Sequence, residues 1–140
     1  MTQYVYEIKG IPTPWQTHSG YGKRSYSKHT PAKTAAQWQL KIQHNGRPII
    51  ERAVRVDFFF EMPVPKSMPK KILKRILEGE KVYCSKRPDA TNLRKFIEDA
   101  LTGTVLCDDN LVVSGETQKY YARGEPKTII VVQEIEDEGI

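Results

Sequence analysis

Four aspartates and one lysine lie close together between residues 87 and 113, in a chain whose formal net charge is +5. They are Asp89, Lys95, Asp99, Asp108 and Asp109. Clustered carboxylates repel one another unless a cation neutralises them, and hard oxygen ligands suit Mg²⁺ or Mn²⁺. A lysine beside such a site can stabilise the charge that develops on a phosphate. These residue types therefore suggest metal-dependent phosphodiester chemistry.

An amphipathic helix is predicted to carry the first part of this group. Its apolar residues from Leu93 to Leu101 follow the spacing i, i+3, i+4, i+7 and i+8, and Gly103 supplies the stop.

The two flanks of this helix should differ in exposure. At about 100° per residue, Asn92, Lys95 and Asp99 share one flank, where we expect partial burial. Arg94 and Glu98 are expected to face solvent on the opposite side.

The acidic turn follows the helix. Asp108 and Asp109 stand between the apolar runs 105–106 and 111–113, which places their carboxylates at the rim of a sheet. Only a short turn separates the helix from these runs, so we expect the helix start, with Asp89, to face the same rim.

Each of these residues also has a simpler structural explanation. Asp89 or Thr91 could be a helix N-cap, because both types accept hydrogen bonds from free N–H groups. Lys95 and Asp99 could form a surface pair one turn apart, and residues 108–110 could be an ordinary turn between strands.

Local signals along the rest of the chain predict the elements that position this group. We expect a strand over 4–9, a loop over 10–27, a helix from an N-cap at Thr30 to Asn45-Gly46, a strand over 53–61, a proline-rich break over 62–69, a helix over 70–78, and strands over 111–121 and 127–134. The fold class that follows is α/β (α+β), with one domain over 1–140. It should have a mixed β-sheet of about four to five strands and about three helices.

Size and composition indicate a soluble globular domain. The 140 residues are 39% hydrophobic and 28% charged, and no apolar run approaches the length of a membrane span. The N-terminus has no apolar signal segment, so we expect a cytoplasmic protein. Cys84 and Cys107 are then expected to be buried free thiols. His18, His29 and His44 lack metal-ligand spacing and are expected in loops or on the surface.

The charge is divided unevenly along the chain. Residues 1–88 carry 17 Lys and Arg against 6 Asp and Glu, a net of +11. A basic region of this kind suggests a polyanionic partner such as DNA. Lys23 and Arg24 in the first loop, and Lys74 and Arg75 in the helix over 70–78, are the candidate phosphate contacts. The alternative is that these charges only solubilise the surface.

Two segments of the chain resemble a known protein family. The segment PDATNLRKFIEDAL, followed by DDNLVV, resembles the RusA family of Holliday-junction resolvases, which carry a PDxDNLxK helix start, a later DAL and a DD turn. The segment IKGIPTPWQTHSGYGKRSYS is more loosely similar to that family's opening strand and basic loop. The resemblance implies a homodimeric, Mg²⁺-dependent endonuclease of DNA recombination and repair that resolves four-way junctions. Such enzymes are often encoded by phages or prophages.

The resemblance also implies roles for individual residues. Asp89 matches the first motif aspartate, Lys95 the motif lysine, Asp99 the acid of DAL, and Asp108 and Asp109 the acids of the DD turn. The catalytic set is then Asp89, Lys95 and Asp109, the metal ligands are Asp89, Asp108 and Asp109, and Thr91, Asn92 and Asp99 support them.

The sequence departs from the family at Thr91, where PDxDNL has its second aspartate. A hydroxyl is a neutral and weaker ligand, so the site loses a charge and some affinity for metal. Two functions remain open. One is a nuclease that makes paired nicks in opposed strands, and the other is a homodimer that binds junctions without cutting them. Paired nicks require two sites, so we expect a two-fold dimer that associates through exposed strand edges.

Overall fold

A mixed five-stranded sheet forms the centre of the computed structural model, which describes residues 2–15 and 31–136. Its elements are β1 (Gln3–Lys9), α1 (Pro31–His44), β2 (Val54–Met62), α2 (Lys70–Leu77), α3 (Ala90–Leu101), the single 3₁₀ turn η1 (Asp109–Leu111), β3 (Val112–Ser114), β4 (Thr117–Tyr121) and β5 (Lys127–Glu134). The strand order is β1-β5-β2-β3, and β4 also pairs with β2. The predicted fold class is confirmed. The predicted N-cap at Thr30 lies outside the described residues.

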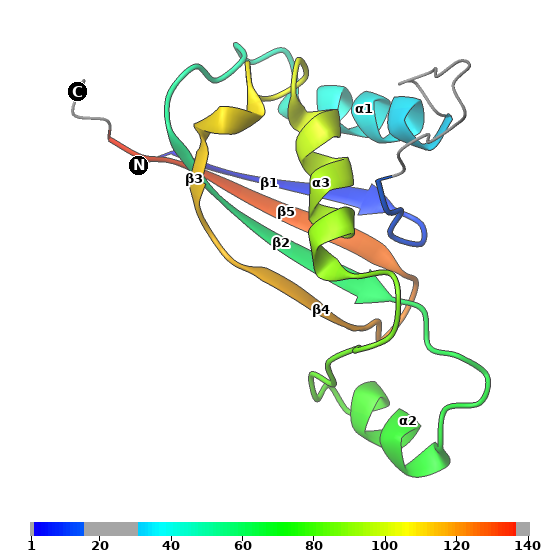
Figure 1. The fold of residues 1–140 in the computed structure, drawn as a ribbon. Helices are drawn as coiled ribbons and strands as arrows, with labels where there is room; N and C mark the ends of the chain where they lie inside the picture. Colours follow the sequence, from blue (N-terminus) through cyan, green and yellow to red (C-terminus); the bar gives the residue numbers. More distant parts are fainter. Residues whose placement is uncertain (1, 16–30, 137–140) are drawn as a thin grey trace, which may run out of the picture.

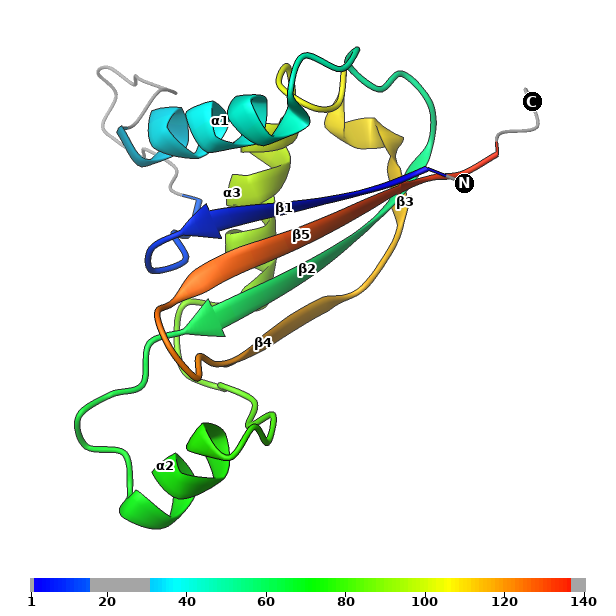
Figure 2. The ribbon, with the colours of Figure 1, turned by 180° about the vertical axis from the view of Figure 1, so that it is seen from behind.

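Helices α1 and α3 lie on one face of the sheet, and within the described residues the opposite face carries no helix (Figures 1 and 2). Strand β2 runs antiparallel to β5 and parallel to β3 and β4. Every second residue of β2, from Val54 to Met62, is buried beneath the helices, which is the period of a strand with one covered face. The predicted apolar stripe of α3, from Leu93 to Leu101, is buried against it. The core therefore lies between β2, β5 and the two helices.

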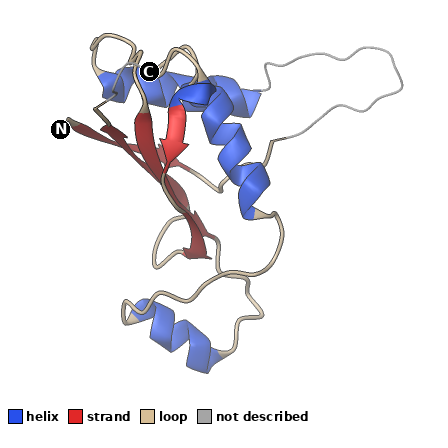
Figure 3. Cartoon of the chain, turned by 60° about the vertical axis from the view of Figure 1, so that its left-hand side comes forward, coloured by secondary structure: helices blue, strands red, loops and turns tan. Residues whose placement is uncertain are grey.

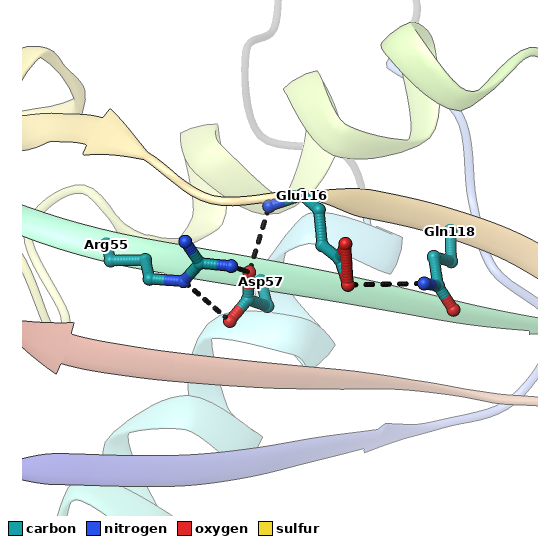
Figure 4. A network of polar contacts seen from close by, with 4 residues as sticks. All are labelled: Arg55, Asp57, Glu116 and Gln118. Carbon is teal, nitrogen blue, oxygen red and sulfur yellow. Dashed lines mark hydrogen bonds and ion pairs between the residues drawn. The ribbon is translucent and has the colours of Figure 1, made fainter.

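The run over 111–121, predicted as one strand, is divided by Gly115. This glycine has a φ of +129°, and a Cβ added there would lie 1.9 Å from the carbonyl oxygen of Val56. Only glycine allows the chain to pass so close to β2 in this conformation. Figure 4 shows the contacts beside the crossing: Asp57 accepts hydrogen bonds from the guanidinium of Arg55 and from the backbone N–H of Glu116. The single-strand prediction was wrong because this close approach is a tertiary feature.

Both outer edges of the sheet have partners within the chain. Along β1, Gln43 accepts from the backbone N–H of Glu7 and donates to its carbonyl, while Gln39 accepts from the N–H of Lys9. Along β4, residues 82–84 lie alongside and exchange backbone hydrogen bonds with residues 119 and 121. The expectation that exposed strand edges form the dimer surface is therefore not supported at these two edges.

Helix α2 projects from one end of the sheet (Figures 1 and 3). It belongs to the segment 63–88, which carries eight Lys and Arg against two Glu, a net of +6. We call this segment the basic projection. Only Ile76 of α2 is buried, and Leu77 remains 53% exposed. The net charge of the basic projection, +6, therefore exceeds the net charge of the whole chain, +5.

Two expectations about single residues were wrong. His44 is buried, and its Nε2–H donates to the carbonyl of Pro48 at 3.0 Å while its Nδ1 is hydrogen-bonded with the hydroxyl of Tyr6 at 2.7 Å. Cys107 is exposed, although Cys84 is buried and both are free thiols as expected. His18 and His29 lie outside the described residues. Within the described residues, no helix combines the length and apolar character that membrane crossing requires.

Candidate active site

Asp89 has a structural role at the start of α3. Its Oδ1 accepts a hydrogen bond of 2.8 Å from the backbone N–H of Asn92, so it is the N-cap of the helix. The ammonium of Lys119 in β4 donates to the carbonyl of Pro88 at 2.6 Å and holds the chain just before the cap. The capping explanation is therefore confirmed for Asp89. Its side chain is nevertheless exposed, with lone pairs left for other partners.

The two adjacent aspartates lie in the turn after α3. Asp108 caps η1, because its Oδ1 accepts from the backbone N–H of Asn110 at 3.1 Å. In the described part of the chain, no backbone N–H donates to the carboxylate of Asp109. Asp109 thus caps no helix or turn with its side chain, which makes it a candidate for a chemical role.

The surroundings of Asp109 disfavour its ionised form. Partial desolvation raises the pKa of this carboxyl, and its hydrogen bond with Asp108 and that residue's negative charge raise it further. Glu98 and Asp99, in the last turns of α3, add smaller effects in the same direction. Asp108 and Asp109 therefore form an acidic pair beyond the helix end, whereas Glu98 and Asp99 are already paired with Arg94 and Lys33. A bound cation would relieve the repulsion within the Asp108–Asp109 pair.

Asp89 and Asp109 lie at opposite ends of α3. Turn η1 lies beside the C-terminal end of the helix, while the N-terminal end lies near β4 (Figure 1). Ten residues separate Asp89 from Asp99, which corresponds to about 15 Å along the helix axis. The expectation that the helix start faces the acidic turn is wrong for a single chain, because the helix end occupies that position. The rise per residue of a helix would have revealed this separation from the sequence.

Lys95 lies on the flank of α3 that faces the segment before α1. Its Nζ is 3.8 Å from the centroid of the Trp15 ring, and the backbone N–H of Trp15 donates to the carbonyl of Asn92 at 3.0 Å. Lys95 and Asn92 are exposed rather than partly buried. Sequence reasoning missed Trp15, because no local spacing relates residue 15 to residue 95.

The opposite flank of α3, expected to face solvent, is only partly exposed because it lies next to the sheet. Arg94 donates from Nε to Glu98 at 2.9 Å, and its guanidinium lies 5.1 Å from the ring centroid of Phe58 in β2. Asp99, which is partly buried as expected, pairs with Lys33 of α1 at 2.9 Å. The proposed Lys95–Asp99 pair is therefore replaced by a contact between helices. A helical wheel gives the phase of these residues but not the neighbour that covers each flank.

The remaining predicted residues lie in α3, in α2 or outside the described residues. Thr91 is exposed in the first turn of α3. Lys74 is exposed on α2, whereas the guanidinium of Arg75 pairs with Glu80. Lys23 and Arg24 lie outside the described residues.

The carboxylate side chains beyond the end of α3 are of the type that binds divalent cations. Carboxylate oxygens are the ligands that Mg²⁺ and Mn²⁺ prefer. Partial desolvation, and then the neighbouring Asp108, raise the pKa of Asp109. In the described part of the chain, however, no three His, Cys, Asp or Glu side chains are grouped closely enough to hold one ion.

Comparison with known proteins gives two findings. A family model described as endodeoxyribonuclease RusA matches residues 10–133. The chain is also 30% identical over 114 residues to the uncharacterized protein YqaN of Bacillus subtilis (strain 168). That alignment covers 81% of this chain and 75% of the relative. The matched region contains α3, the acidic turn and the basic projection.

Proposed function

Since the chain belongs to the RusA family of endodeoxyribonucleases, we propose that it is a metal-dependent enzyme that resolves Holliday junctions by paired nicks in opposed strands. The match over residues 10–133 carries this proposal, because it spans the acidic residues at both ends of α3. The reaction would serve DNA recombination and repair.

In this proposal, residues of α3 and of the acidic turn have separate roles in metal binding and phosphate contact. Asp89 and Asp109 would hold Mg²⁺ or Mn²⁺, with Asp108 beside them. Bound at this position, such an ion supplies charge neutralisation at the phosphate and a more acidic water. Lys95 would donate to a non-bridging phosphate oxygen, whose negative charge grows during cleavage.

Two copies of the chain would explain why Asp89 and Asp109 are far apart in one. If two α3 helices lie antiparallel about a two-fold axis, the start of each helix approaches the acidic turn of the other. Each site would then combine Asp89 of one copy with Asp109 of the second, and the dimer would hold two equivalent sites. A four-way junction has matching two-fold symmetry, which suits paired nicks.

The basic projection is the proposed DNA contact. This segment has a net charge of +6 and extends away from the sheet (Figure 3). The converging arms of a DNA junction could reach it there. Lys74 is exposed and available, whereas a phosphate contact by Arg75 must compete with Glu80. Phosphate contacts of this kind give affinity without sequence choice.

Mixing two inactive variants tests the shared site. Asp89→Asn and Asp109→Asn should each abolish Mg²⁺-dependent cleavage of a synthetic four-way junction while binding in EDTA persists. In a mixed dimer, one site carries both substitutions and the other carries neither. The mixture should therefore regain nicking of a single strand.

The controls separate the possible failures. Glu125→Gln, a charge change at an exposed residue of the β4–β5 connection, should cut like the wild type. An inactive mixture beside an active wild type would show that each site lies within one copy. A wild type that never cuts would refute the nuclease. Light scattering at micromolar concentration tests the dimer itself.

Thr91 supports a second candidate function. With a neutral hydroxyl where the family has a carboxylate, the chain could bind junctions as a homodimer without cutting them. Thr91→Asp would add an oxygen ligand and a charge at the exposed start of α3. In a working enzyme this change should lower the Mg²⁺ concentration needed for half-maximal cleavage. Activity that appears only in the Thr91→Asp variant would favour the binding protein.

A further inference from the structure

We propose that Trp15 is the positioning residue for Lys95, an inference that rests on the proposed cleavage of DNA. The Nζ of Lys95 lies 3.8 Å from the centroid of the Trp15 ring. This is the closest approach of a cation to an aromatic ring in the described part of the chain. Indole is the aromatic side chain that attracts an ammonium most strongly.

The ammonium of Lys95 contacts an aromatic ring and not a carboxylate in the described part of the chain. Asp99, one helical turn away, pairs with Lys33 of α1 instead. Among residues 2–15 and 31–136, no carboxylate forms an ion pair with Lys95. An aromatic ring orients a cation without neutralising it, so the charge stays available for a phosphate.

Trp15 is itself held in place from two sides. Its backbone N–H donates to the carbonyl of Asn92, one turn before Lys95 on α3. Its side chain packs against the hydrophobic core. The ring is therefore a fixed surface, while the lysine is an exposed chain with four rotatable bonds that would otherwise sample many conformers.

The geometry assigns separate roles to the two residues. One side of the ammonium faces the indole, which leaves N–H donors on the other side for a phosphate oxygen. Trp15 would touch no reacting atom and would act only by holding Lys95 in the conformer that reaches the phosphate. The loss of the ring should then lower the cleavage rate and leave junction affinity nearly unchanged.

Single-turnover cleavage of a four-way junction provides the kinetic test. Trp15→Leu, which removes the π face, should slow cleavage roughly twofold to thirtyfold. Trp15→Phe should recover part of the rate, because a smaller π face remains. In a Lys95→Ala background, Trp15→Leu should cause no further loss. Equal losses in both backgrounds would overturn the proposal, since they would show a purely structural role.

A fluorescence test does not depend on cleavage. The chain has two tryptophans, so Trp38→Phe leaves Trp15 as the sole indole emitter. Lys95→Met in that background should shift the emission of Trp15, because it removes a charge at the ring. Lys41→Met is the matched control, since Lys41 lies 5.8 Å from the Trp38 ring instead. If the emission of Trp15 is the same with and without Lys95→Met, the contact is refuted. This result does not depend on whether the protein cleaves DNA.

Discussion

Asp89 is predicted to have two separable roles, and two substitutions distinguish them. Its Oδ1 accepts the 2.8 Å hydrogen bond that caps α3, and its charge lies at the positive end of the helix dipole. Asp89→Ala removes both, so we expect a loss of about 1 kcal/mol or slightly more. Asp89→Asn keeps an oxygen acceptor and loses only the charge, which should cost about 0.5 kcal/mol.

Thermal unfolding followed by circular dichroism measures the structural role. For a domain of this size, the Ala variant should melt roughly 3–4 °C lower and the Asn variant roughly 1–2 °C lower. Cleavage should be lost in both variants, because both lack the carboxylate proposed to bind metal. Equal melting temperatures for the two variants would refute the cap argument. Full cleavage by Asp89→Asn would refute the metal role while leaving the cap intact.

Three further predictions concern pH, backbone geometry and DNA contact. Burial raises the pKa of Tyr6 to about 12, so the unfolded chain ionises first and stability should fall by roughly 2 kcal/mol between pH 10 and 12. Urea unfolding of Tyr6→Phe should lack that loss. Gly115→Ala should cost at least about 3 kcal/mol in urea unfolding, because its Cβ would meet a β2 carbonyl. Gly10→Ala is the control for backbone strain alone: its φ of +105° is also positive, but its Cβ would meet no atom within 4 Å, so it should cost less. Lys74→Gln should reduce the salt dependence of junction binding by about one counterion, and Arg75→Gln should reduce it less, because Arg75 is already paired with Glu80.

Local signals in the sequence predicted most of the elements. The strand over 127–134 has the predicted bounds. The helix from Pro31 ends at His44, directly before Asn45 and Gly46, which both have positive φ. The buried stripe of α3 also follows directly from its spacing. These features depend on residues within one turn or one strand, where backbone geometry determines which side chains share a face.

Contacts between distant segments could not be predicted in this way. The stacking of Arg94 on Phe58, and the pairing of Asp99 with Lys33, depend on which element packs against each flank of α3. The contact between Trp15 and Lys95 joins segments 80 positions apart in the sequence. For the candidate site, the residue types and their order could be predicted from the sequence. The separation of its acids became visible only once the helix was placed against the acidic turn.

The glutamines beside β1 have a consequence for how the protein behaves at high concentration. A free strand edge is a template on which other chains can add strands and begin to aggregate. Gln39 and Gln43, one helical turn apart on α1, occupy the outward-facing N–H groups of Glu7 and Lys9 with side-chain amides. These amides resemble a peptide group but cannot continue a ladder. These two side chains thus occupy the second half of the β1 edge, where another chain would otherwise add a strand.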